Sequence, residues 1–282
     1  MKPDNIERIV DSIDRLPTLP AIYMRLSNLL SQSDSTVMMI GEVISEDPTI
    51  AAKILKIVNS AFYGFPKKIG NLQRAVVILG LNEIKSLVLA TSMLRTFTEL
   101  GSGHEFNMTG FWEHSVGCAV SSKIVAEAAY LKNPEDVFTG GLLHDIGKLI
   151  HALYMPQEFT RVITEIEHAH ISMLESEQNI FGFSHTQTGR MLAEKWYFPE
   201  EVAHMIGGHH MHGEASTPMK EVAAVHLGNS LSIAFGLGFA GEKVVPVISQ
   251  NAWEILGLRL GDLESIAGRI QRSFHEASVI LE

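Results

Sequence analysis

Apolar residues recur every three to four positions along nearly all of the chain, the spacing that places them on one face of an α-helix. No stretch alternates apolar and polar residues in the manner of a strand bounded by hairpin turns. The sequence therefore predicts an all-α fold, a compact multi-helix bundle with short connections. Helices are expected near residues 5–15, 20–31, 36–46, 71–79, 82–97, 109–130, 134–154, 156–169, 185–196, 219–235 and 262–280.

Proline residues mark several helix starts. Asp47-Pro48 combines a residue that caps a helix N-terminus with a proline at the first helical position, and residues 50–58 then supply one apolar stripe. Asn133-Pro134 and Phe198-Pro199 begin helices in the same way. These starts agree with the helices that the periodicity predicts.

The composition is that of an ordinary globular protein: 282 residues, 46% hydrophobic and 19% charged, which excludes disorder over most of the chain. The single cysteine, Cys118, excludes an internal disulfide and fits a reducing compartment. The N-terminal segment lacks the continuous apolar run of a secretory signal. The longest uncharged stretch, 222–241, contains His226, Asn229 and four glycines, so we interpret it as a core helix and its exit loop. We expect a cytoplasmic protein with no membrane partner.

Charge and histidine are unevenly distributed along the chain. Residues 1–103 carry a net charge of +1, whereas residues 104–282 carry −11, and none of the thirteen histidines precedes His104. A Gly-Ser-Gly sequence at 101–103 coincides with this change. We therefore predict a helical N-terminal lobe, 1–103, and a second helical lobe, 104–282. The overall charge of −10 disfavours nucleic acid as a partner, because Lys and Arg must neutralise the phosphates.

The segment GGLLHDIGKLI places His144 beside Asp145 within the helix expected over 134–154. A carboxylate on an inward helix face is costly to bury unless a cation or a hydrogen-bond donor compensates it. A metal ion would do so, and so would an ion pair with Lys148 at i+3. The residues expected on this face are Val137, Gly141, His144, Asp145 and Lys148.

Other histidines lie among small or polar residues at helical spacing. Five histidines and one aspartate from four helices match a metal centre assembled inside a bundle. Neutral imidazoles with a carboxylate suit iron, zinc, manganese or nickel, and more than four ligands allow two ions, or one ion with open positions. His114 is followed by Gly117, Cys118 and Ser121, His185 is followed by Thr188 and Gly189, and His209-His210 ends the helix that Pro199 begins. We interpret the remaining histidines as surface or packing residues: His104, His151, His168, His170, His204, His212, His226 and His275.

Residues 53–85 carry a local net charge of +5. One interpretation is a set of solvated helix faces whose aliphatic stems pack against the fold. The other is a docking surface for a signalling partner, either an acidic protein or a phosphorylated segment. The charged residues are Lys53, Lys56, Lys67, Lys68, Arg74 and Lys85, against Glu83 alone.

Several long motifs, in order along roughly residues 10–235, resemble the HDOD domain of bacterial signalling proteins. The resemblance implies an all-helical fold related to the HD superfamily of metal-dependent phosphohydrolases, with an added helical N-terminal lobe. The motifs are LPTLPAIYMRL (16–26), ISEDPTIAAKILKIVNSAFYG (44–64), IGNLQRAVVILGLNEIKSL (69–87), FWEHS (111–115), GLLHDIGKL (141–149), GFSHTQTGRMLAEKWYFP (182–199) and HH (209–210).

The resemblance also implies a ligand set, because the matching superfamily positions bind one or two divalent metal ions, with Asp145 as the bridging carboxylate. Asn229 stands where the superfamily usually has an aspartate, and an amide is a poorer ligand. The segment HHMHGEAS lacks the GYP sequence of the HD-GYP cyclic-di-GMP phosphodiesterases. The implied metal ligands are His114, His144, Asp145, His185, His209 and His210.

Two functions fit these patterns. The first is a signal-transduction protein whose divalent metal centre is structural, sensory or vestigial. The second is a metal-dependent phosphohydrolase acting on a phosphoester or nucleotide, with Asp145 and Lys148 as catalytic residues. In that case metal ions would lower the pKa of a bound water and Lys148 would help to hold a phosphate. Metal ions would also allow the acidic second lobe to attract an anionic substrate.

Overall fold

Every regular element in the described part of the chain is helical and no strand occurs there, which confirms the all-α prediction. The predicted helix at 5–15, residues 102–103 of the predicted boundary, and His104, His170 and His212 lie outside this part. The computed structural model describes residues 20–32, 34–60, 63–101, 106–169, 171–211, 219–239, 241 and 244–281.

The described residues group into two compact units. One unit, here the site unit, lies within Gly101–Gln271, and the other, here the N-terminal unit, combines Pro17–Leu100 with Arg272–Glu282. The sequence-based division placed the last of these segments in the second lobe. The division into lobes 1–103 and 104–282 stays a prediction.

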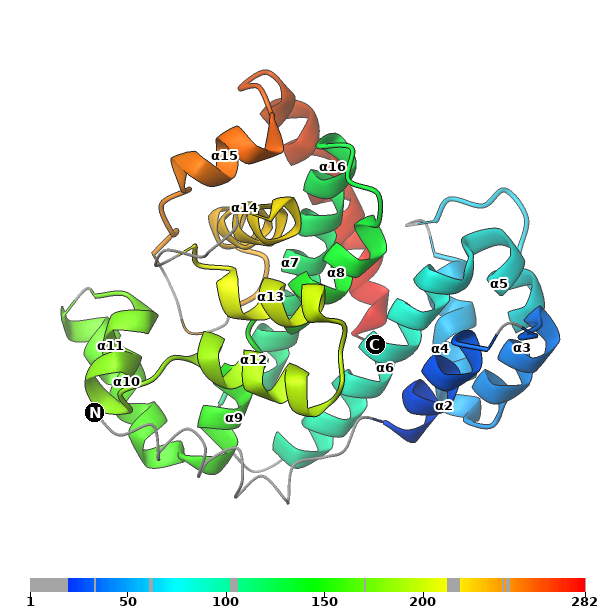
Figure 1. Ribbon diagram of the computed structural model, residues 1–282, viewed down its shortest axis with the longest axis horizontal. Helices are drawn as coiled ribbons and strands as arrows, with labels where there is room; N and C mark the ends of the chain where they lie inside the picture. The colour runs from blue at the N-terminus through cyan, green and yellow to red at the C-terminus, as the bar shows by residue number, and fades with distance from the viewer. Residues whose placement is uncertain are drawn as a thin grey trace. The chain divides into compact units, whose positions relative to one another are not determined.

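The N-terminal unit is built from short amphipathic helices. Asp47 caps one of them as predicted, since its side chain accepts hydrogen bonds of 3.1 Å from the backbone N–H groups of Thr49 and Ile50. The helices are α2 (Ala21–Leu30), α3 (Val37–Ser45), α4 (Pro48–Val58), α5 (Leu72–Leu79) and α6 (Leu81–Gly101) (Figure 1). The 3₁₀-helix η2 (Ser278–Ile280) packs against α4.

The site unit is a bundle in which α7 packs against α8 and α14, and α12 packs against α9 and α13 (Figure 1). The helices α11 and α15 are absent from the sequence-based prediction, and α8 and α9 divide a stretch predicted as one helix, whereas the others match it closely. The full set is α7 (Met108–Ala128), α8 (Pro134–Leu143), α9 (Ile146–Tyr154), α10 (Pro156–Ala169), α11 (Met173–Ile180), α12 (His185–Lys195), α13 (Glu200–Gly208), α14 (Lys220–Ala234), α15 (Gln250–Leu256) and α16 (Asp262–Ala277), which continues beyond the site unit.

Small residues bring α8 and α14 close to α7. A Cβ atom on Gly141 would lie 2.9 Å from Ala119 Cα, and one on Gly228 would lie 2.7 Å from the Ser122 backbone nitrogen. Larger side chains would therefore push these helices apart. The stretch interpreted as a core helix is α14, and none of the described helices has the length and apolar content to cross a bilayer.

The prediction of one continuous helix over 134–154 is wrong. Helix α8 ends at Leu143 and α9 begins at Ile146, so His144 and Asp145 form a turn between them. A tertiary contact accompanies the break: a Cβ atom on Gly147 would lie 2.0 Å from the backbone oxygen of His185. The first turn of α9 thus rests directly on the start of α12, a constraint that helical periodicity within 134–154 does not reveal.

Candidate metal centre

Each predicted ligand is positioned by a helix end or a close helix contact. His114 lies within α7, His144 and Asp145 form the α8–α9 turn, and His185 is the first residue of α12. A capping box precedes it, in which the Ser184 side chain accepts a hydrogen bond from the Gln187 backbone and the Gln187 side chain accepts one from the Ser184 backbone.

The two remaining histidines follow the end of α13. His209 is the C-cap residue of that helix, His210 comes next, and Met211 then has a left-handed φ of 54°. Residues other than glycine rarely adopt this conformation, so the backbone turns away sharply after His210.

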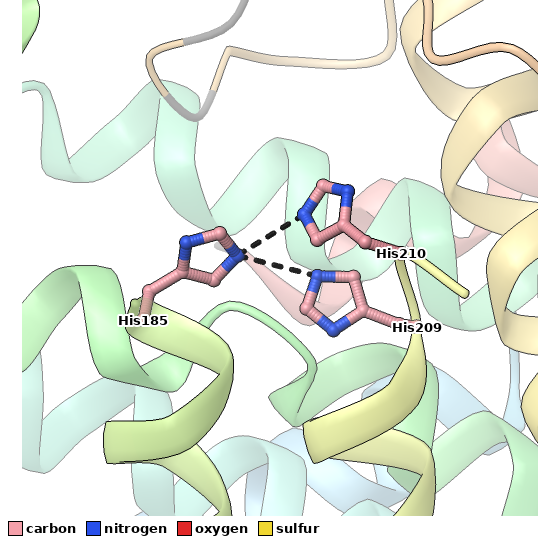
Figure 2. Close-up of side chains that lie close together, drawn as sticks. All are labelled: His185, His209 and His210. Atoms are coloured by element: carbon pink, nitrogen blue, oxygen red, sulfur yellow. Dashed lines mark hydrogen bonds between the residues drawn. The ribbon is translucent and has the colours of Figure 1, made fainter. Parts of the chain in front are cut away.

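The structure brings all six predicted side chains together in the interior, each at most 8% exposed. His114 Nε2 lies 3.3 Å from His144 Nε2. His185 Nε2 lies 3.4 Å from His209 Nε2 and 3.2 Å from His210 Nε2, as Figure 2 shows. Four chain segments thus direct ring nitrogens to one place.

Asp145 lies between two groups of histidines. Its Oδ2 is 3.7 Å from His114 Nε2 and 3.3 Å from His144 Nε2. Its Oδ1 is 3.4 Å from His185 Nε2 and 3.6 Å from His209 Nε2. We call His114, His144 and Asp145 Oδ2 group A, and we call His185, His209, His210 and Asp145 Oδ1 group B.

The Asp145 carboxylate fits a metal site better than an ordinary buried polar group. Neither of its oxygens makes a hydrogen bond with a described residue, and its side chain is fully buried. Lys148 Nζ lies 2.8 Å from Oδ2, close enough for the predicted i+3 ion pair. The angles between the two groups are not those of a hydrogen bond. Imidazoles, which bind metal in their neutral form, around an under-bonded carboxylate are a donor set that suits a divalent transition-metal ion. His114, His144 and Asp145 could hold one ion, and His185, His209 and His210 another.

Three imidazoles are held by their outer nitrogens. His144 Nδ1 lies 2.7 Å from the Gly141 carbonyl oxygen, and His209 Nδ1 lies 2.8 Å from the Ile206 carbonyl oxygen. His185 Nδ1 lies 2.7 Å from Glu177 Oε2. These oxygens only accept, so Nδ1 carries the hydrogen and Nε2 is the nitrogen left to face the centre.

A buried carboxylate behind His185 escaped the sequence analysis. Glu177 accepts from both Nδ1 and the backbone N–H of His185, and its Oε1 lies 3.1 Å from His151 Nδ1. His151 Nε2 in turn contacts Thr188 Oγ1 at 2.9 Å. One feature of the sequence could have indicated its burial: Glu177 follows Met173 by four residues and so lies on the same, buried face of α11.

Burial and neighbouring charges set the protonation of the cluster. Burial lowers the pKa of His114 and of His209 to about 3, and it holds the pKa of His210 well below the ordinary value. Burial also disfavours charge on His144, but the Asp145 carboxylate and Cys118 outweigh it and raise the pKa of His144 to about 10.

The two buried carboxylates remain charged despite desolvation. Burial would raise the pKa of Asp145, yet His144 and Lys148 hold it well below the usual range. Burial is likewise opposed at Glu177, where His185 and His151 lower the pKa to about 2. The interior therefore holds two anionic side chains among mostly neutral imidazoles.

Two polar residues of α14 adjoin the cluster. Asn229, next to His114, is 2% exposed, and its Oδ1 makes no hydrogen bond with a described residue. His226 Nδ1 lies 2.8 Å from the His209 carbonyl oxygen, and its Nε2 accepts from the Ser249 backbone. His226 and His151 are thus packing residues that also support ligand-bearing segments.

Known proteins resemble this chain over nearly its whole length. An uncharacterized protein of Treponema pallidum is 24% identical over 271 residues, which is 94% of this chain and 46% of the relative. The chain therefore spans about half the length of that curated relative. A candidate phosphohydrolase of Shewanella amazonensis shares the fold, with a TM-score of 0.76, 23% identity, and coverage of 97% of this chain and 98% of that one.

The family assignment rests on two further findings. An HDOD domain protein of unknown function from Geobacter sulfurreducens has a TM-score of 0.78 and 25% identity, covering 98% of this chain and 97% of its own. The family model described as the HDOD domain matches residues 16–212, well over half of the sequence. The chain belongs to the HDOD domain family.

Proposed function

We propose that this chain is a bacterial signal-transduction protein of the HDOD family with a retained HD-type centre for one or two divalent metal ions. The observation that supports it most is the Asp145 carboxylate, which is buried without hydrogen bonds to described residues and faced by four imidazole nitrogens. A divalent cation compensates the desolvation of such a carboxylate. The proposed location is the cytoplasm.

Residues around the proposed centre orient its imidazole rings. The carbonyl oxygens of Gly141 and Ile206 and the carboxylate of Glu177 hold three imidazoles with Nε2 directed inward. A bound divalent ion supplies a Lewis acid and lowers the pKa of water. The residues that would hold it are His114, His144, Asp145, His185, His209 and His210, and the donor set suits iron, zinc, manganese or nickel.

Elemental analysis of the purified protein tests this proposal. We expect about one or two equivalents of a divalent transition metal, as such donor sets favour. The double variant His144→Ala with Asp145→Ala should lose the metal, whereas His204→Ala, a partly exposed histidine of α13, should retain it. A protein that stays metal-free after reconstitution with excess ions would refute the centre.

A second candidate function is a metal-dependent phosphohydrolase acting on a phosphoester or nucleotide. The observation that favours it is Lys148, a buried ammonium beside Asp145 that could bind a phosphate oxygen. The assay is phosphate or nucleotide release from phosphoesters and cyclic dinucleotides by the metal-loaded protein. If the protein is an enzyme, the wild type should turn over substrate, and the double variant His144→Ala with Asp145→Ala should not. Turnover that survives in this variant would assign the activity to another site.

The signalling proposal also needs a partner, for which we propose an acidic protein segment. Lys67, Lys68 and Arg74 of the N-terminal unit are exposed, and Val77 nearby in sequence is 68% exposed. Charge reversal at the three basic residues should weaken binding of an acidic apolar peptide and reduce its salt dependence. Unchanged binding would place any docking surface elsewhere.

A further inference from the structure

Resting on the metal centre proposed above, the geometry points to two unequal metal subsites: group B binds the first divalent ion, and group A binds a second ion only at higher free metal concentration. The two groups share Asp145, so a second ion binds against the charge of the first. The inequality comes from the residues that surround each group.

The first difference is a fixed positive charge. Lys148 Nζ lies 2.8 Å from Asp145 Oδ2, the oxygen that faces group A. An ammonium at this distance already compensates the oxygen and repels a cation that approaches the same side of the carboxylate. Group B receives Oδ1, to which His185 and His209 point.

The second difference is the support behind the ligands. His185 of group B has the Glu177 carboxylate on its Nδ1 at 2.7 Å, which makes the imidazole a stronger donor. In group A the corresponding partners are neutral: the Gly141 carbonyl oxygen for His144, and the Ser232 hydroxyl for His114 at 3.4 Å. Group B therefore has an additional negative charge behind one ligand, whereas the Lys148 ammonium contacts the Asp145 oxygen that faces group A.

The third difference is the number of strong donors. Group B offers three imidazoles and one carboxylate oxygen, a complete set for a four-coordinate ion. Group A offers two imidazoles and one carboxylate oxygen, and the polar group beside it is the uncharged Asn229. The buried Asn229 Oδ1, which bonds to no described residue, adds a weaker donor to group A.

These differences give the centre two loaded states, one with a single ion and one with two. The supply of metal decides between them. Each second-sphere contact changes metal affinity about 10- to 100-fold, so we expect the two binding steps to differ by at least tenfold.

Titration of the chelator-stripped full chain with Co²⁺, followed by visible absorption and calorimetry, tests the inference. We expect a first equivalent that binds at least about tenfold more tightly than the second. His210→Ala should remove the tight step, His114→Ala should remove only the weak step, and His204→Ala should change neither. Asn229→Asp should tighten the weak step at least about tenfold, because it adds a carboxylate to group A.

Two equal steps would overturn the inference while leaving the proposed centre intact. So would loss of the tight step in His114→Ala with its survival in His210→Ala. If the folded wild-type chain binds no Co²⁺ in the cluster, the proposed function fails as well. The two alanine variants decide the order of filling even if Asn229→Asp does not fold.

Discussion

The N-terminal unit and the site unit bury different kinds of side chain. In the N-terminal unit the α4 helix buries one apolar stripe, Ile50, Ile54, Ile57 and Val58, and leaves its polar face to solvent. In the site unit α7 is buried on almost every side, and its interior positions include His114 and several serines. Burying charge costs free energy, and the site unit buries a cluster of charged and polar side chains around Asp145, whereas the core of the N-terminal unit is mainly apolar.

Tryptophan gives this comparison a convenient probe. All three tryptophans, Trp112, Trp196 and Trp253, lie in the site unit, so their fluorescence reports that unit, while far-ultraviolet circular dichroism reports both. Metal binding and metal-linked stability should appear in the first signal. Core substitutions in the N-terminal unit should appear mainly in the second.

The largest expected effect is the response of the metal-free protein to acid. The pKa of His114 and of His209 is about 3 in the folded protein, against an ordinary value of 6.5. As the pH falls from 6.5 towards 3, these histidines bind protons in the unfolded chain but not in the folded chain. The site unit should therefore lose several kcal/mol of stability over this range. The raised pKa of His144 acts in the opposite direction but mainly above pH 6.5, where the folded chain is protonated at His144 and the unfolded chain is not. Well below pH 6.5 both states are protonated at His144, so it adds little to the loss.

Denaturant titrations followed by tryptophan fluorescence from pH 6.5 to pH 4 would measure this loss. Added metal ions should reduce this loss of stability at the upper end of the pH range, where they still compete with protons for the imidazole nitrogens. Stability of the site unit that does not change over this range would show that its imidazoles are not buried and neutral.

Asp145→Asn is expected to remove most of the stabilisation by metal. Metal at about a thousand times its Kd adds roughly 4 kcal/mol to the wild-type protein by mass action. The variant removes the only charged oxygen ligand proposed for either subsite and leaves imidazoles alone, so its unfolding midpoint should respond much less to metal. The measurement is the midpoint with and without metal, compared with His204→Ala. A full metal response in the variant would show that Asp145 is not a ligand.

Ile54→Ala tests the apolar core of the N-terminal unit. Ile54 is fully buried in the N-terminal unit, and truncating it should cost about 2–5 kcal/mol through lost burial and a cavity. The circular dichroism transition should shift, while the metal affinity of the folded protein stays unchanged. Loss of metal affinity would mean that the centre depends on packing in the N-terminal unit.

The smallest expected effect comes from Glu177→Gln. The amide keeps the size of the side chain but removes the charge behind His185, so metal affinity should fall about 10- to 100-fold, roughly 1.4–2.7 kcal/mol. Glu194→Gln, an exposed residue of α12, is the matched control. Unchanged affinity would show that Glu177 serves packing alone.

Local signals predicted much of the fold. Asp47-Pro48 starts α4 as expected, because capping and the proline ring act within one turn. The break at His144-Asp145 was missed because Gly147 meets the His185 backbone, a contact between segments far apart in sequence. Short helices such as α15 were also missed, since seven residues carry too little periodicity to predict a helix.

Spacing and the family resemblance together predicted the side chains of the candidate site but not its supports. The histidines were visible as residue types, and the structure shows which of their nitrogens converge. Glu177 and Thr188 matter through partners 8 and 37 residues away, His185 and His151, so their roles depend on the folded arrangement. That the six predicted residues bind metal stays a prediction.

Anomalous diffraction from crystals of the metal-reconstituted protein, collected at the absorption edge of the metal, is the most direct test of the centre. The account predicts a strong peak among the Nε2 atoms of His185, His209 and His210, next to Asp145 Oδ1. A peak elsewhere with none in this cluster, or a refined structure in which these imidazoles point apart, would contradict it.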